Sequence, residues 1–178
     1  MKAFVILAIA AIAMCVLAAA PIQVAHAAGE AAADVSPIFG ITIPPGFRDW
    51  QVVSVAHEAG SNNDLRVVLG NAIAIKAFRE GKLPFPDGSI IARMAWRYTP
   101  SAENNEIFGR RQSFVAGAPI NIQFDVKDSR RFASTDGWGY AQFKNGKPAA
   151  AAIQQTCFAC HVRFKAGDLV FTHYAPTP

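Results

Sequence analysis

Apolar and polar positions divide the chain into one long apolar run at its start and many short runs after it. Residues 3–20 carry no charge, and beyond them Gly, Pro, Asn and Asp interrupt the pattern every few residues. Val-rich or partly alternating runs of this length are typical of strands. They predict strands at 50–56, 65–69, 89–98, 112–116, 120–126 and 138–143. Short strands separated by turn residues predict an antiparallel sheet, so the expected fold class is α+β, mostly β, with a few short helices.

Two segments between the predicted strands favour helix. Asn71 precedes a run with helical spacing at 72–80, and Gly81 follows it, which are the residues that begin and end helices. Pro148 suits the first position of a second helix that runs through 149–156 into two cysteines. A polar loop is expected at 101–105, a single helical turn at 128–133 and a turn at 144–147.

The apolar start of the chain has the features of an export signal. Lys2 is followed by the apolar run, and the small-x-small sequence at 25–27 is typical of a cleavage site. We predict a signal peptide at 1–28, a flexible leader at 29–42 and one domain at 43–178. An uncleaved membrane anchor is the alternative, and either interpretation exports the remainder of the chain. The expected location is the periplasm, with no membrane contact after cleavage and no nucleic acid as partner.

Composition limits the architecture further. The chain has 178 residues, a net charge of +4, 52% hydrophobic residues and three cysteines. This length suits one domain, and three cysteines are too few for a disulfide-rich scaffold. Cys15 lies inside the predicted signal, so the mature chain keeps two.

Those two cysteines belong to the sequence Cys157-Phe-Ala-Cys160-His161. C-x-x-C-H is the attachment pattern of c-type haem. We therefore expect one covalent haem c, with thioether bonds to Cys157 and Cys160 and with His161 as the axial ligand of the iron. A thioredoxin-like redox pair, a zinc site and a plain disulfide are the alternatives.

The sixth position of such an iron would decide between electron transfer and ligand binding. Met94 lies in an apolar run that is typical of a core strand, His57 borders a polar loop, and His173 is close to the end of the chain. None has the context of an axial ligand, so we expect an open distal face.

Several segments together resemble the cytochrome P-460 family. They are the runs at 87–93 (DGSIIAR) and 126–133 (VKDSRRFA), then Trp138, the haem motif, and 168–172 (DLVFT), and the resemblance extends from about 43 to 176. It implies an exported, mostly β, usually homodimeric protein with one haem and an open distal site. The family includes enzymes that oxidise hydroxylamine and nitric oxide, and a cytochrome c′-beta branch that binds nitric oxide beneath an apolar cap.

Two positions depart from the oxidising members. Their Lys that is bonded to the porphyrin matches Arg93, which is a poor nucleophile, and their distal acid matches Gln123. The resemblance therefore points to the cytochrome c′-beta branch, with Arg93 and Gln123 as distal candidates. Arg93 has an equal alternative, which is pairing with a haem propionate or a surface acid. The candidates for an apolar cap are Phe78, Phe85, Phe114, Phe124 and Phe158.

Three functions follow from these expectations. The first is binding of a small ligand such as nitric oxide, or redox chemistry of nitrogen oxides, at an open haem. The second is oxidation of hydroxylamine or nitric oxide, and the third is plain electron transfer with a redox partner of unknown identity. Whether the chain is an enzyme is left open by the sequence.

Overall fold

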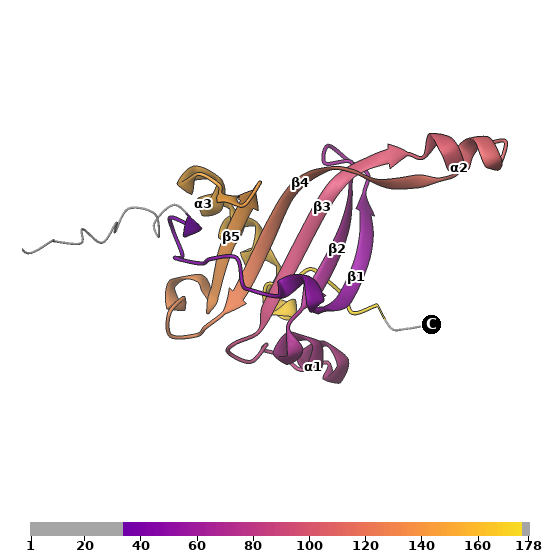
Figure 1. The fold of residues 1–178 in the computed structure, drawn as a ribbon. Coiled ribbons are helices and arrows are strands. Elements are labelled where there is room, and N and C mark those ends of the chain that lie inside the picture. Colours follow the sequence, from indigo (N-terminus) through magenta and orange to yellow (C-terminus); the bar gives the residue numbers. More distant parts are fainter. Residues whose placement is uncertain (1–33, 176–178) are drawn as a thin grey trace, which may run out of the picture.

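The structure is a computed structural model, and it describes residues 34–175. The predicted signal peptide at 1–28 lies outside the described residues. A six-stranded antiparallel sheet dominates the fold, with each strand beside its neighbour in sequence (Figure 1). The strands are β1 (Gln51–Glu58), β2 (Asp64–Gly70), β3 (Ile90–Pro100), β4 (Phe114–Lys127), β5 (Trp138–Lys144) and β6 (Lys147–Pro148). The predicted fold class is confirmed.

The helices are short and lie between or after the strands. They are α1 (Ala72–Glu80), α2 (Ala102–Ile107) and α3 (Ala151–His161), with 3-10 turns η2 (Phe47–Asp49), η3 (Ala133–Thr135) and η4 (Val162–Gly167). Helix α1 has the predicted bounds. The Asn71 side chain accepts a hydrogen bond from Ala74 N at 2.9 Å, and Gly81 ends the helix with φ 59°.

Three local expectations were wrong. The predicted loop after β3 forms helix α2, because the Ser101 hydroxyl accepts a hydrogen bond from Asn104 N and caps it. The two strands predicted around Gly117–Pro119 are one continuous strand, β4, since shifts in the β3–β4 register near Trp96 accommodate the proline. Pro148 does not begin a helix but lies in β6, paired with Phe143.

The two faces of the sheet are covered by different parts of the chain (Figure 1). The N-terminal segment crosses one face, where Ile41 and Phe47 pack with Phe124 and Met94 in an apolar cluster. Residues 36–41, which we expected in a flexible leader, are part of this arrangement: Ile41 N donates to the buried Ser36 hydroxyl at 3.1 Å.

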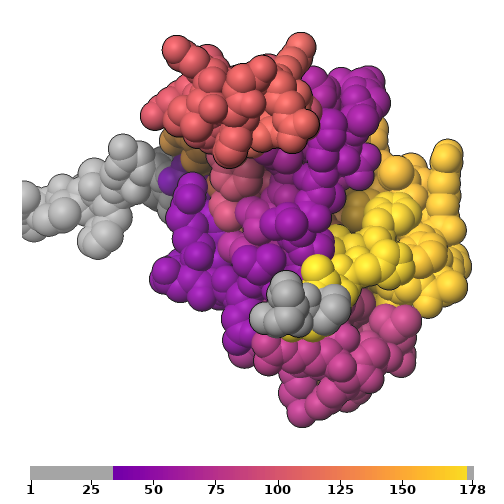
Figure 2. Space-filling model, turned by 90° about the vertical axis from the view of Figure 1, so that its right-hand side faces the viewer, coloured from indigo at the N-terminus to yellow at the C-terminus, as the bar shows by residue number. Residues whose placement is uncertain are grey.

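Helix α1, helix α3 and the C-terminal segment lie over the other face. There Val53, Trp138, Tyr140 and Leu169 form a second buried cluster. In Figure 2 the C-terminal segment runs across the surface between β1 and α1, and Ala175 N donates to Val53 O at 2.8 Å. Within residues 34–175, no helix combines the length and apolar character needed to cross a membrane.

Candidate functional site

Helix α3 carries the whole C-x-x-C-H motif on its last two turns. Cys157 is half-buried, Cys160 is exposed, and both are free thiols. Burial is the main cause that raises the pKa of the Cys157 thiol to about 11. A nucleophilic redox cysteine needs a lowered pKa, so this environment does not favour the thioredoxin-like alternative. Residues 34–175 also contain no group of three His, Cys, Asp or Glu side chains that could hold a metal ion, as a zinc site would require.

His161, the last residue of α3, is held by the turn that follows η4. Its Nδ1 lies 2.8 Å from the carbonyl oxygen of Leu169. Because a carbonyl only accepts, Nδ1 carries the proton, and in the neutral ring Nε2 keeps its lone pair. The rings of Tyr140 and Phe171 pack beside the imidazole, with centroids 4.7 and 5.0 Å away.

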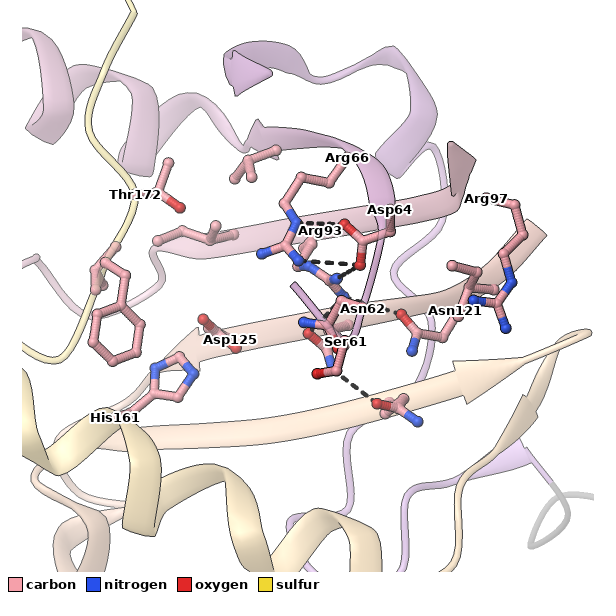
Figure 3. A pocket seen from close by; sticks show the side chains of 17 residues that line it. Ser61, Asn62, Asp64, Arg66, Arg93, Arg97, Asn121, Asp125, His161 and Thr172 are labelled. Atoms are coloured by element: carbon pink, nitrogen blue, oxygen red, sulfur yellow. Dashed lines mark hydrogen bonds and ion pairs between the residues drawn. The ribbon is translucent and has the colours of Figure 1, made fainter. Parts of the chain in front are cut away.

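A cavity of about 560 Å³ separates His161 from the middle of the sheet (Figure 3). Its wall is formed by side chains of β2, β3, β4 and β5 that point to the same face, and its rim by the β1–β2 loop and residues 170–172. Polar wall residues outnumber apolar ones: they are Asp64, Arg66, Arg93, Arg97, Asn121, Gln123, Asp125 and Gln142.

Arg93 is the centre of a hydrogen-bond network in this wall. Its guanidinium donates to Asp64 at 2.8 Å and to the side-chain oxygens of Asn121 and Gln123, both at 3.1 Å. Asp64 is 2% exposed and also pairs with Arg66 at 2.9 Å. Burial lowers the pKa of Arg93, but a guanidinium stays charged at any physiological pH. One buried carboxylate thus pairs with both guanidinium groups, and the more exposed Glu58 lies 3.4 Å from Arg66.

Both distal candidates from the sequence line this cavity. Arg93 and Gln123 are paired residues of β3 and β4, and Gln123 Nε2 also donates to Gln142 at 2.8 Å. Arg93 already has Asp64 as an acidic partner inside the cavity. The acid that pairs with Arg93 in the structure is therefore a buried one, and a haem propionate as its partner stays a prediction.

Asp125 is a wall residue that sequence reasoning missed. It lies two residues beyond Gln123 on β4, hence on the same face, and Figure 3 shows it on the His161 side of the arginine network. Burial raises the pKa of its carboxyl group, and the charges of His161 and Arg93 oppose that shift without cancelling it. The cavity therefore contains a second carboxyl group, besides that of Asp64, despite the Gln at position 123. The strict alternation of Asn121, Gln123 and Asp125 was the signal that could have identified it.

The other residues considered as iron ligands lie elsewhere. Met94 is buried in the cluster on the opposite face of the sheet, as expected for a core residue. His57 is exposed and stacks on Tyr98, with ring centroids 3.8 Å apart. His173 lines a separate hollow beside α1 and η4. Within the described residues, His161 is the only His or Met that lines the cavity.

The phenylalanines proposed as a cap are not in the wall. Phe124 lies in the cluster on the opposite face, and Phe78, a residue of α1, packs against Phe85 with ring centroids 4.9 Å apart. Phe114 stacks on Tyr98 near the far end of β3 and β4. The phenylalanine that lines the cavity is Phe171, which sequence reasoning did not single out as a cap, and it packs on His161.

A comparison with protein-family models identifies the family of this chain. The model of cytochrome P460 matches residues 44–172, which include all six strands and the C-x-x-C-H helix. The chain belongs to the cytochrome P460 family. Membership in this family implies a haem cofactor and a role in nitrogen chemistry. No curated protein matches the chain. The family match does not distinguish the cytochrome c′-beta branch from the oxidising members.

The residues around the cavity fit a haem of the kind that the cytochrome P460 family uses. Pockets for cofactors commonly measure about 300–1,000 Å³, and this one falls within that range. The Tyr140 hydroxyl, beside His161, is buried without a hydrogen-bond partner in residues 34–175. A free imidazole nitrogen, two thiols on one helix and an unpaired buried hydroxyl are the groups that a covalently attached cofactor would satisfy.

Proposed function

We propose that the chain is a mono-haem c-type cytochrome that binds a small, polar, nitrogen-containing molecule in the cavity opposite His161. Cys157 and Cys160 would hold the porphyrin through thioether bonds, and His161 would ligate the iron through Nε2. The bound group would supply a ligand-binding and one-electron redox centre. The single observation that carries this proposal is the placement of His161 across a 560 Å³ cavity from a wall of hydrogen-bonding side chains.

The wall supports a ligand that accepts and donates hydrogen bonds. Arg93 offers donors, the amides of Asn121 and Gln123 offer both donors and acceptors, and Asp125 offers a carboxyl group. An apolar cap, as expected from the cytochrome c′-beta branch, would favour a gas with weak hydrogen bonding. Hydroxylamine and the protonated nitrogen oxides match the observed wall better, while nitric oxide remains small enough to enter it.

A second candidate function, oxidation of hydroxylamine, is favoured by Asp125. Oxidising an N–H or O–H group requires a proton acceptor within reach of the substrate. Burial raises the pKa of the Asp125 carboxyl group in the direction of neutral pH. A general base is most effective when its pKa is near the working pH. By the resemblance, Arg93 matches the Lys of the oxidising members, so the proposed enzyme would work without a porphyrin–lysine bond.

Intact mass and visible spectra of protein matured in a host competent for c-type attachment test the first proposal. We expect the mass of the chain plus one haem, a five-coordinate high-spin ferric spectrum and a spectral change on adding nitric oxide. A colourless protein of bare-chain mass, or a six-coordinate low-spin spectrum, would contradict it. The same mass shows whether residues 1–28 have been removed on export.

Substitution of Asp125 tests the second function. In Asp125→Asn, the rate of hydroxylamine oxidation with an artificial electron acceptor should fall by about 10²–10⁴-fold, the usual contribution of a general base. Nitric oxide affinity should stay nearly unchanged. Asp87→Asn is the matched control, because Asp87 is a carboxylate bonded to Ser129 outside the cavity. Equal rates in the two variants would leave ligand binding as the function.

Export to the periplasm and assembly as a homodimer belong to the same proposal. Both follow from the sequence and the resemblance. Cell fractionation tests the first, and the molar mass of the purified holoprotein in solution tests the second.

A further inference from the structure

A buried ion pair lies on the His161 side of the molecule, outside the cavity wall. Lys127 Nζ, at the end of β4, is 2.8 and 3.0 Å from the two carboxylate oxygens of Asp168. Their side chains are only 7% and 12% exposed. Such a pair loses much of its hydration, so its net contribution to stability is small. Asp168 is followed by Leu169, whose carbonyl oxygen lies 2.8 Å from Nδ1 of His161, and this position indicates another role.

Asp168 begins a turn that the backbone does not adopt readily. Asp168 has φ 50° and Leu169 has φ 67°, so two consecutive residues with side chains occupy the left-handed region. That region is unfavourable for residues with a Cβ, and Leu tolerates it less well than Asp. Conformations of this kind persist where the surroundings impose them, and they concentrate at functional sites.

Contacts of the Asp168 side chain, the Leu169 side chain and the Leu169 backbone hold this turn in place. The Asp168 carboxylate is held by Lys127 and accepts a second hydrogen bond from Phe85 N at 2.8 Å. Leu169 is 3% exposed and anchored in the core, and its N donates to Phe164 O at 3.0 Å. The backbone is therefore fixed on both sides of the Leu169 carbonyl.

That carbonyl is the group that accepts the Nδ1 proton of His161 at 2.8 Å. A strong acceptor at Nδ1 makes an imidazole more electron-rich at Nε2 and fixes the orientation of its ring. We propose that Lys127 and Asp168 are positioning residues, which hold the Leu169 carbonyl on His161 and so set the donor strength of the axial ligand. This inference rests on the proposed ligation of iron by His161.

The test compares holoproteins by two measurements that follow the iron–histidine bond. These are the iron–histidine stretching band in the resonance Raman spectrum of the ferrous protein, and the reduction potential. In Lys127→Met the band should move to lower frequency and the potential should rise, because a weaker donor stabilises ferric iron less. Asp168→Asn should shift both in the same direction by less. Asn tolerates the left-handed region and still accepts from Phe85 N.

Lys165→Met is the matched control. It removes one Lys from an ion pair with Asp136 in the same part of the chain, at 3.4 Å, but this Lys is 70% exposed. We expect its band and potential to equal those of the wild type. The double variant Lys127→Met/Asp168→Asn leaves neither partner as an unpaired buried charge, so it should fold even where a single variant does not.

The possible results separate the two proposals. Absence of an iron–histidine band in the wild type would overturn the proposed function itself. A wild-type band that stays unshifted in Lys127→Met, Asp168→Asn and the double variant would overturn only the positioning role. A shift of the same size in Lys165→Met would also overturn it, because the effect would then be one of general charge.

Discussion

The two faces of the sheet are formed by the same strands but differ in the polarity of their side chains. Along β3, Ile91 and Arg93 point into the cavity, while Ala92 and Met94 point into the apolar cluster beneath the N-terminal segment. The cavity face has a charged network and unfilled space, whereas the other face is packed with aromatic rings around Phe124. The difference indicates that one face serves packing alone, whereas the other combines a buried apolar cluster with polar groups that are costly to bury.

The largest effect is expected on the apolar face. Phe124 is fully buried and packs edge-on against Phe47 and Phe143, at 5.2 and 5.9 Å between centroids. Phe124→Ala should lower the free energy of unfolding by about 3–5 kcal/mol, through lost burial and a new cavity. Urea denaturation measures this change. The visible spectrum of the folded holoprotein should stay that of the wild type, and an altered spectrum would show that the faces are not independent.

A smaller loss is expected from the network on the cavity face. Asp64→Asn leaves Arg66 and Arg93 without their shared buried carboxylate. The free energy of unfolding should fall by about 1–3 kcal/mol, and anions such as azide should bind more tightly because the cavity becomes more positive. Glu58→Gln is the control, since Glu58 pairs with Arg66 at 3.4 Å but is 52% exposed. Equal losses in the two variants would show that burial of Asp64 is irrelevant.

Asp125 should make stability depend on pH. Burial raises its folded-state pKa above the ordinary value of 3.8, so the folded protein holds this proton more tightly than the unfolded chain does. Wild-type stability should therefore decrease relative to Asp125→Asn as the pH rises from the unfolded pKa through the folded pKa. At pH values above the folded-state pKa, the difference in stability between the two proteins should stay constant. Thermal melts of both proteins across acid and neutral pH measure it, and parallel curves would contradict the raised pKa.

The smallest effect should come from the uncovered edge of the apolar face. Val55 is 71% exposed and pairs with Val67 across the β1–β2 ladder, beyond the cover of the N-terminal segment. Val55→Thr keeps the β-branched shape and should change the free energy of unfolding by less than about 0.5 kcal/mol. A larger loss, seen by the same urea method, would mean that this edge is covered in solution, as in a homodimer.

Local sequence signals identified most of the fold. Helix α1 was predicted with its observed bounds because the Asn71 cap, the periodic apolar positions and Gly81 all agree. Strand β4 was divided in the prediction at Gly117–Pro119, because a proline normally interrupts a ladder. Strand β4 tolerates Pro119 because its pairing with Trp96 of β3 is irregular. That pairing joins two strands and is not visible in the local sequence.

The predictable part of the candidate site is the part whose residues are adjacent in the sequence. Cys157, Cys160 and His161 form such a motif at the end of α3, and His161 lines the cavity. Arg93 and Gln123 both line the same cavity, since alternation along a strand fixes which side chains share a face. The ion pair of Lys127 and Asp168 joins residues far apart in sequence, and no local pattern shows that two charged side chains are buried together.

The sequential strand order has a consequence for assembly. Each strand from β1 to β6 pairs with the next one along the chain, so the polar wall forms from sequential neighbours that are joined by turns or by one short helix. Contacts of this local kind favour rapid folding. Helix α3 follows the last strand, so the wall residues on β2 to β5 precede the cysteines in the sequence, and the rim at 170–172 follows them. The pairing of these strands therefore does not involve the segment that carries the cysteines, and His161 of that segment closes the cavity on the side facing the sheet.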